Sequence, residues 1–280
     1  MKIPQSIKIG LFLTLLLGSL GGGLPAAGGG ELSDAEPARL RLVSRVAGTD
    51  GQEAIRIGLH IALAPGWKTY WRNPGEAGIP PSFDWSGSRN LAQAIIHWPR
   101  PSYFESFGMG SWGYHGEVLF PIDVELATPG APLDIQLRLQ LGLCKDICIP
   151  FEHELSLSLA PTAAVVTPEA GLIDAYARRI PREAGGEAAL AEAISAATTG
   201  GREFTLTVTS RSALRAPEVI IEGKNGSYFE IVSETAASDT ERRFHVTADL
   251  PSKSDRLTGQ DITVTVIDGD RAAEKKLRIR

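Results

Sequence analysis

The 280-residue sequence contains only two cysteines, Cys144 and Cys148, and no run rich in lysine or arginine. Its formal net charge is -5, so its surface would repel phosphate backbones, and we expect no nucleic-acid partner. Two thiolates and His153 are too few ligands for a metal site, and we expect neither a metal nor a cofactor. Beyond the first thirty residues, no apolar segment approaches the length of a membrane span.

The first thirty residues have the pattern of a secretory signal peptide. Lys2 and Lys8 precede a short apolar core over residues 9–20, and small residues follow it. This core is shorter than a membrane span of about 20 residues. No cysteine that would indicate a lipoprotein follows it. We therefore expect residues 1–30 to direct export to the periplasm, where disulfides persist, with an uncleaved N-terminal anchor as the alternative.

Alternation of polar and apolar residues, with frequent turn signals, dominates the rest of the chain. Short strands at this spacing are typical of β-sandwiches. We expect strands over residues 38–46, 55–63, 92–98, 117–126, 133–143 and 152–159, and then over residues 204–209, 218–222, 228–232, 244–248, 262–267 and 276–279.

Helical patterns are confined to the segment between these two groups of strands. Thr167-Pro168-Glu169 has the composition of a helix start before residues 170–180, and the Ala/Glu-rich segment 183–198 predicts a second helix. The predicted fold is therefore all-β with a short helical linker. We expect the signal peptide (1–30), a β-sandwich (31–162), a helical linker (163–200) and a second, smaller β-sandwich accessory domain (201–280).

The two cysteines are four residues apart, and an even count in an exported chain predicts one intramolecular disulfide. Extended residues at this separation lie about 13 Å apart, whereas a disulfide needs Cα atoms within about 7 Å. The chain must therefore turn over residues 145–147. So short a loop stabilises a fold by only about 2 kcal/mol, and strained or exposed bridges are the reducible ones. Spacing alone leaves a reactive bridge and a purely structural bridge equally open.

Aromatic residues are concentrated in two Gly- and Pro-rich segments. The candidate site residues are Trp67, Tyr70 and Trp71 in segment 65–76, and Phe107, Trp112, Tyr114 and His115 in segment 103–116. Apolar side chains on a Gly-flanked loop pack poorly in a core, which favours a functional role for loop 105–116 as a cap over the sulfurs. For the tryptophans, packing at the end of a sandwich core is slightly favoured over lining a site.

Four sequence motifs taken together are specific. They are Pro-Gly-Trp-Lys-Thr-Tyr-Trp-Arg-Asn-Pro-Gly-Glu at 65–76, Phe-Asp-Trp-Ser-Gly-Ser at 83–88, Gly-Tyr-His-Gly-Glu-Val at 113–118 and Cys-Lys-Asp-Ile-Cys-Ile-Pro at 144–150. In these motifs residues 35–160 resemble the N-terminal periplasmic domain of DsbD-type protein-disulfide reductases, including the ScsB-like group. The resemblance implies an immunoglobulin-like sandwich, a redox-active pair in which Cys148 engages partners, and an aromatic cap loop that maps onto residues 107–116.

The resemblance also implies partners. In the DsbD family a thioredoxin-like domain, fed by a membrane domain, reduces the pair, which passes electrons to isomerases or cytochrome-maturation proteins. This sequence contains no CxxC, so we expect a separate membrane electron donor of the DsbD or CcdA type and periplasmic thioredoxin-like or disulfide isomerase partners. The expected function is that of a thiol–disulfide oxidoreductase relay. The alternatives are a non-enzymatic binding or scaffold module with a structural disulfide and, more weakly, a carbohydrate-binding sandwich using exposed Trp67 and Trp71.

Overall fold

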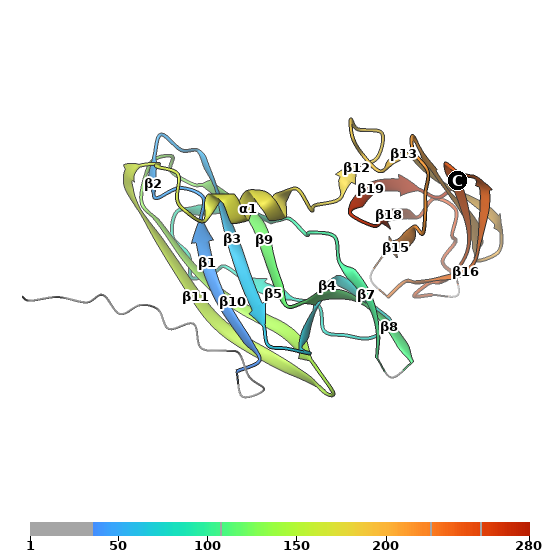
Figure 1. The fold of residues 1–280 in the computed structure, drawn as a ribbon, viewed down its shortest axis with the longest axis horizontal. Helices are drawn as coiled ribbons and strands as arrows, with labels where there is room; N and C mark the ends of the chain where they lie inside the picture. The colour runs from blue at the N-terminus through green and yellow to red at the C-terminus, as the bar shows by residue number, and fades with distance from the viewer. Residues whose placement is uncertain (1–35, 107, 225, 253) are drawn as a thin grey trace, which may run out of the picture. The chain divides into compact units, whose positions relative to one another are not determined.

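Strands predominate in the computed structural model, which describes residues 36–280 except 107, 225 and 253. The expected signal peptide lies outside the described residues. The first sandwich contains a four-stranded sheet of order β1-β3-β9-β6 and a larger sheet of order β2-β11-β10-β4-β8-β7, in which β5 pairs with β10 (Figure 1). The bounds are β1 Ala38–Ser44, β2 Gly48–Asp50, β3 Ala54–Leu63, β4 Lys68–Gly75, β5 Ser82–Asp84, β6 Leu91–Ile96, β7 Ser102–Ser106, β8 Met109–His115, β9 Glu117–Leu126, β10 Leu133–Cys144 and β11 Cys148–Ala163.

The segments that we expected to be aromatic-rich loops are therefore largely strands. Residues 68–75 form β4, and β7 and β8 form an antiparallel hairpin over most of segment 102–115. The expectation of a loop over 105–116 is wrong. Glycine, proline and aromatic residues interrupt the alternation of polar and apolar residues in these segments, so the sequence does not show a strand pattern. The structure shows why glycine is needed: β8 approaches β4 so closely that a Cβ at Gly113 would lie 2.0 Å from the carbonyl oxygen of Thr69.

Strand β10 shows how alternation builds the core. Every second residue from Leu133 to Leu143 is a buried aliphatic side chain, whereas Gln136, Arg138 and Gln140 point outward and are exposed. At the end of the strand the outward-facing positions become buried as well, because Gly142 and Cys144 are covered. The end of β10 is thus enclosed on both faces, and this is where the first cysteine lies.

The linker contains one helix, α1 (Ala170–Ala177), which lies along β9 (Figure 1). It buries Ile173 and Tyr176, and the Tyr176 hydroxyl donates to the carbonyl oxygen of Glu117. Thr167 does not cap the helix, because its hydroxyl donates to the carbonyl oxygen of Ser44 instead. None of the described helices is both long enough and apolar enough to cross a membrane.

The prediction of a second helix over residues 183–198 is wrong. That region contains β12 (Arg182–Glu183) and β13 (Ala191–Gly200), and β13 pairs antiparallel with β14 (Glu203–Ser210). A register shift between Ala191 and Ala193 places Ala191 and Ile194 on the buried side. Their spacing of three imitates one face of a helix in the sequence, and sheet pairing overrides the helical propensity of alanine and glutamate.

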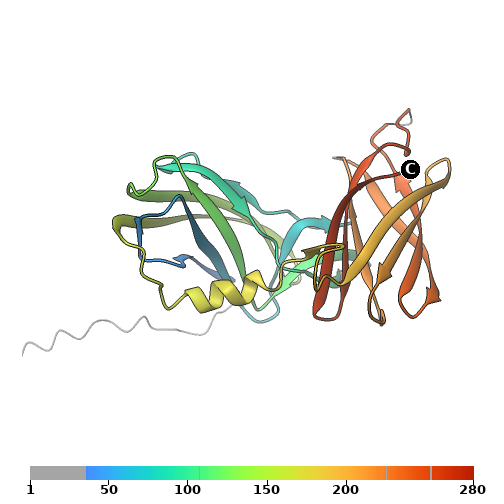
Figure 2. The ribbon, with the colours of Figure 1, turned by 90° about the horizontal axis from the view of Figure 1, so that it is seen from above.

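The second sandwich consists of two four-stranded sheets of order β12-β19-β18-β15 and β13-β14-β17-β16, drawn in colours from yellow to red in Figure 2. Its remaining strands are β15 Glu218–Glu222, β16 Tyr228–Ser238, β17 Glu241–Asp249, β18 Asp261–Asp268 and β19 Arg271–Arg278. Phe204 and Phe244 are the largest buried side chains of its core. The predicted fold class, all-β with a short helix between two β-sandwiches, is confirmed. The described residues of both sandwiches belong to one compact unit.

Candidate functional site around the Cys144–Cys148 disulfide

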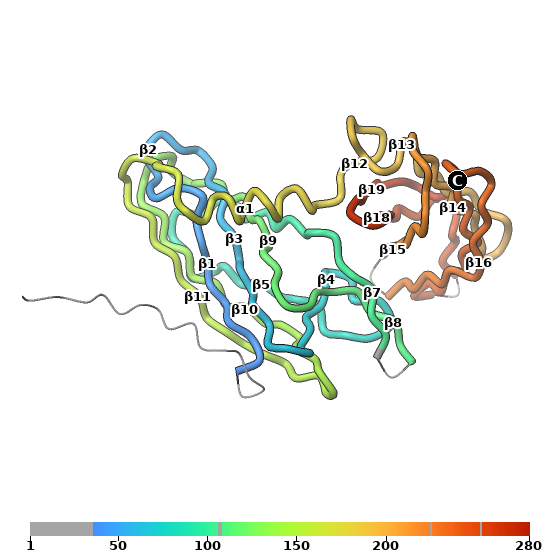
Figure 3. Tube along the Cα trace, in the orientation of Figure 1, coloured from blue at the N-terminus to red at the C-terminus, as the bar shows by residue number. Residues whose placement is uncertain are grey.

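Cys144 and Cys148 face each other at the last paired position of the β10–β11 hairpin and form a disulfide, with Cα atoms 4.1 Å apart. The tube in Figure 3 follows both strands to the yellow-green turn between them. In this turn the backbone N–H of Lys145 donates to the carbonyl oxygen of Ile147. The predicted intramolecular bridge and the turn over residues 145–147 are confirmed.

The two cysteines differ in exposure. Cys144 is only 2% exposed, whereas Cys148 is exposed. The difference arises on the outer face of β10, where a Cβ at Gly142 would lie 2.7 Å from the Cβ of Ile79 and 3.0 Å from the ring of Tyr70. Glycine at this position leaves room for both side chains to cover the end of the strand. A nucleophile from solvent therefore reaches Cys148 more readily than Cys144.

Tyr70, on β4, contacts both sulfurs. Its hydroxyl lies 2.8 Å from Sγ of Cys144 and 3.3 Å from Sγ of Cys148, and it is the donor because disulfide sulfurs carry no proton. Gly142 and Gly78 form the slot for the ring: a Cβ at Gly78, whose φ is +130°, would lie 2.4 Å from it. Burial raises the pKa of Tyr70, so the hydroxyl keeps its proton at neutral pH.

Phe104, on β7, packs against Tyr70. Their ring centroids are 5.9 Å apart, and the ring of His115 lies 5.2 Å from that of Phe104. The ammonium of Lys68 lies 4.4 Å from the centroid of the Phe104 ring, a cation–π contact. Burial, and secondly the charge of Lys68, lower the pKa of His115. Phe104 thus links Tyr70 to His115 and Lys68, and these four side chains come from the three strands β4, β7 and β8.

Strand alternation explains why Tyr70 and Lys68 lie on the outer face. Residues 68 and 70 of β4 share that face, whereas Trp71 points into the core and is fully buried. In the strand register Lys68 stands opposite both Cys144 and His115, so β10, β4 and β8 place these three residues in one row. Sequence analysis singled out His115 but missed Phe104, although the aromatic pair Tyr103-Phe104 could have indicated it.

The remaining expected site residues lie elsewhere. Trp67 and Trp71 belong to the buried core, so the exposed tryptophans that the carbohydrate-binding interpretation needs are not present. Tyr114 is also buried in the core, and its hydroxyl donates to the carbonyl oxygen of Pro99. Trp112 packs edge-on against Tyr103, with centroids 5.2 Å apart. Phe107 lies outside the described residues.

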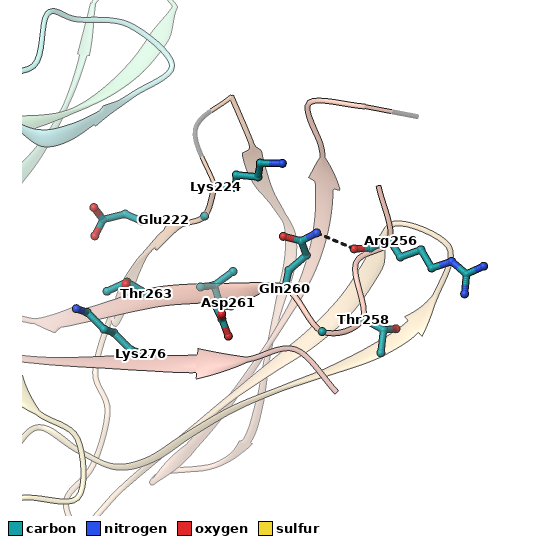
Figure 4. A pocket seen from close by; sticks show the side chains of 11 residues that line it. Glu222, Lys224, Arg256, Thr258, Gln260, Asp261, Thr263 and Lys276 are labelled. Atoms are coloured by element: carbon teal, nitrogen blue, oxygen red, sulfur yellow. Dashed lines mark hydrogen bonds between the residues drawn. The ribbon is translucent and has the colours of Figure 1, made fainter. Parts of the chain in front are cut away.

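No group of three or more potential metal ligands occurs among residues 36–280 as far as they are described. A separate pocket of about 750 Å³ lies on the second sandwich and is lined by residues of β15, β18, β19 and two loops. Figure 4 shows that its cationic side chains Lys224, Arg256 and Lys276 lie on different sides, with the Arg256 guanidinium directed away from the other two. These groups do not converge on one ligand position.

Fold and site together define a two-sandwich protein with a disulfide that closes a hairpin on the outer face of a sheet. Residues 43–160 match the family model described as thiol:disulfide interchange protein DsbD, N-terminal, and residues 179–280 match a domain of unknown function (DUF8393). Residues 43–160 of the first sandwich thus match the DsbD N-terminal domain that the sequence motifs predicted.

Two solved structures are similar to the chain. The chain is similar to the N-terminal periplasmic domain of ScsB from Proteus mirabilis, with 25% identity and a TM-score of 0.71, over 89% of this chain and 95% of that chain. Such coverage includes both sandwiches. The reduced DsbD N-terminal domain from Neisseria meningitidis also matches, with 18% identity and a TM-score of 0.27, over 45% of this chain and 89% of that chain. No curated protein sequence matches the chain.

Proposed function

We propose that this protein is a periplasmic thiol–disulfide interchange protein in which the Cys144–Cys148 pair relays electrons between partner proteins. The observation that carries the proposal is the Tyr70 hydroxyl, which reaches both sulfurs from a slot formed by two glycines. A purely structural bridge needs no polar group directed at its sulfurs. A bridge that opens produces a thiolate, and a buried thiolate needs a hydrogen-bond donor.

Reduction begins when a partner's thiolate attacks Sγ of Cys148, the exposed cysteine. A bond forms between the partner's sulfur and Cys148, the Cys144–Cys148 bond breaks, and Cys144 leaves as a thiolate. The second thiolate of the partner then attacks the partner's own sulfur in this mixed disulfide and releases Cys148. Two electrons pass to this protein, the partner is left with a disulfide, and the two thiolates here take up protons from water.

Cys144 is the leaving group in this sequence, and its burial sets the requirement for Tyr70. Burial disfavours a thiolate and so raises the pKa of a thiol, which slows departure from the bridge. The Tyr70 hydroxyl, 2.8 Å from Cys144 Sγ, offsets this by donating to the developing charge. The reverse sequence, in which Cys148 attacks a partner's disulfide and Cys144 resolves the mixed disulfide, uses the same contact.

The surroundings of Cys148 suit a protein partner. Ile147 is 70% exposed at the tip of the hairpin, and Ile79 beside Gly142 is 38% exposed, so both offer apolar contact next to the reactive sulfur. We assign the partners to periplasmic thioredoxin-like or disulfide isomerase proteins, with a separate membrane donor of the DsbD or CcdA type. The periplasmic description of the similar ScsB domain supports this location.

The reduction potential of the pair tests the proposal. The protein is equilibrated with glutathione buffers of graded composition, and the oxidised fraction is determined by thiol labelling. A relay has a potential well above about -300 mV, whereas a structural disulfide lies below it. A potential below that limit would overturn the proposal and favour a scaffold module with a structural bridge.

A further inference from the structure

We propose that the second sandwich positions the disulfide site, through Tyr228 bound to Glu76 and through Glu222 and Glu274 bound to Arg72. This inference rests on the proposed function and gives the second sandwich a role in it. The residues concerned touch neither sulfur. They act on the strand and the hairpin that carry Tyr70 and Phe104, so they are positioning residues.

The first contact is made on β4. Arg72 lies two residues after Tyr70, and its guanidinium donates to Glu222 with N–O distances of 3.0 and 2.6 Å. The same guanidinium pairs with Glu274, whose carboxylate also accepts from the Thr265 hydroxyl at 3.0 Å. Glu222, Thr265 and Glu274 all belong to the second sandwich, on β15, β18 and β19. The side chains of the three paired ions are only 21–27% exposed, so solvent screens these pairs less than surface pairs.

The second contact is made by a carboxylate that two groups share. The Tyr228 hydroxyl, at the start of β16, donates to Oε1 of Glu76 at 2.7 Å. The other oxygen of Glu76 accepts from the backbone N–H of Gly110, on β8, at 2.7 Å. These donors lower the pKa of Glu76, and burial together with the Glu76 carboxylate raises the pKa of Tyr228 to about 12. At neutral pH the proton therefore stays on the tyrosine and the charge on the glutamate.

Glu76 lies where two segments that cover the sulfurs meet, namely residues 76–79 and the β7–β8 hairpin. Its backbone N–H donates to the carbonyl oxygen of Gly110 at 3.1 Å, which ties segment 76–79 to the β7–β8 hairpin. That segment continues to Gly78, against the Tyr70 ring, and to Ile79, over the end of β10. In the hairpin, Phe104 pairs with Ser111, the neighbour of Gly110.

Restraint at Glu76 is therefore transmitted in two directions: along segment 76–79 to the slot of Tyr70, and through the hairpin to Phe104. Loss of the Tyr228 hydroxyl leaves the covalent chemistry intact but loosens both segment 76–79 and the β7–β8 hairpin. Loss of the carboxylates of Glu222 and Glu274, which bind Arg72, removes a restraint on β4 next to Tyr70. We expect the sulfurs to become more accessible and the tyrosine–sulfur contact less constant.

The test measures the rate at which dithiothreitol reduces the disulfide in the full chain. The variants are Tyr228→Phe, Glu76→Gln, both together, and Glu222→Gln with Glu274→Gln. We expect each single variant to raise the rate by about fivefold, the scale of one hydrogen bond's net contribution, and the Tyr228→Phe/Glu76→Gln double variant to exceed neither single one. Asp270→Asn is the matched control, because it removes an ion pair to Arg100 that also joins the sandwiches but involves neither β4 nor Glu76.

The outcomes separate the two proposals. A wild-type potential below about -300 mV overturns the proposed function, whatever the variants do. A relay potential together with variant rates equal to that of the wild type overturns the positioning role alone. Fully additive effects of Tyr228→Phe and Glu76→Gln, or an equal acceleration in Asp270→Asn, would also overturn it, because the change would then reflect general loosening.

Discussion

The hydroxyl of Tyr70 lies 2.8 Å from Sγ of Cys144, a residue 74 positions further along the chain. The two residues come from neighbouring strands of one sheet, β4 and β10, and both are on its outer face. The contact is possible because Gly142 and Gly78 have no side chains where the tyrosine ring passes. The disulfide lies on the outside of the sandwich, yet Cys144 is buried and its sulfur accepts a hydrogen bond from Tyr70.

Replacing Tyr70 by phenylalanine removes this donor and keeps the ring. In the reduced protein the thiolate of Cys144 then loses a hydrogen bond worth about 1.5–3 kcal/mol, which corresponds to a rise of about one to two units in the pKa of the thiol. The ultraviolet absorbance of the thiolate, followed against pH in the Cys148→Ser background, measures it. Tyr114→Phe is the control, since its hydroxyl donates to Pro99. Equal titrations for the two tyrosine variants would contradict the role of Tyr70.

Single-cysteine variants distinguish the two sulfurs. With Cys144→Ser, the exposed Cys148 remains and should form a stable mixed disulfide with oxidised glutathione, detected as an increase in intact mass. With Cys148→Ser, the buried Cys144 should react at least about tenfold more slowly, because the covered end of β10 restricts approach. Faster capture by Cys144 would reverse the assignment of attacking and resolving cysteine.

Phe104 should shield the pair without supporting the core. Phe104→Ala removes the ring that packs on Tyr70, and we expect glutathione to reduce the disulfide several-fold faster. Phe104 is only partly buried, so stability should fall by less than the roughly 3–5 kcal/mol typical of a buried phenylalanine such as Phe120. Phe120→Ala provides the comparison in thermal unfolding. Unchanged reduction with a collapsed melting temperature would assign Phe104 to the core instead.

His115 should make stability depend on pH. Burial and the charge of Lys68 hold its pKa in the folded protein below the ordinary value of about 6.5, so below that pH the unfolded chain binds more protons than the folded one. Stability should therefore fall as the pH decreases from 7 to 5. Chemical denaturation at several pH values should show a smaller fall for His115→Gln, and an identical slope in both proteins would contradict the shift.

Much of the first sandwich was predictable from local patterns. Alternation over residues 55–63 and 117–126 gave strands close to the observed β3 and β9, because a strand with one buried face must repeat every two residues. Alternation failed for β4 and β8, where neighbouring strands lie too close for larger side chains, and for β13, where a register shift breaks the period. In these strands a partner strand, and not the local sequence, sets the geometry.

The sequence by itself determined that two cysteines four residues apart must meet across a turn to form a disulfide, since the chain contains no other cysteine. It also identified the motif that contains Tyr70. Only the tertiary structure decided which aromatic residues belong to the site: Tyr70 and Phe104 face outward over the sulfurs, while Trp71 and Tyr114 enter the core. The physical reason is that the facing of a side chain depends on strand register, which is set by contacts between residues far apart in the sequence.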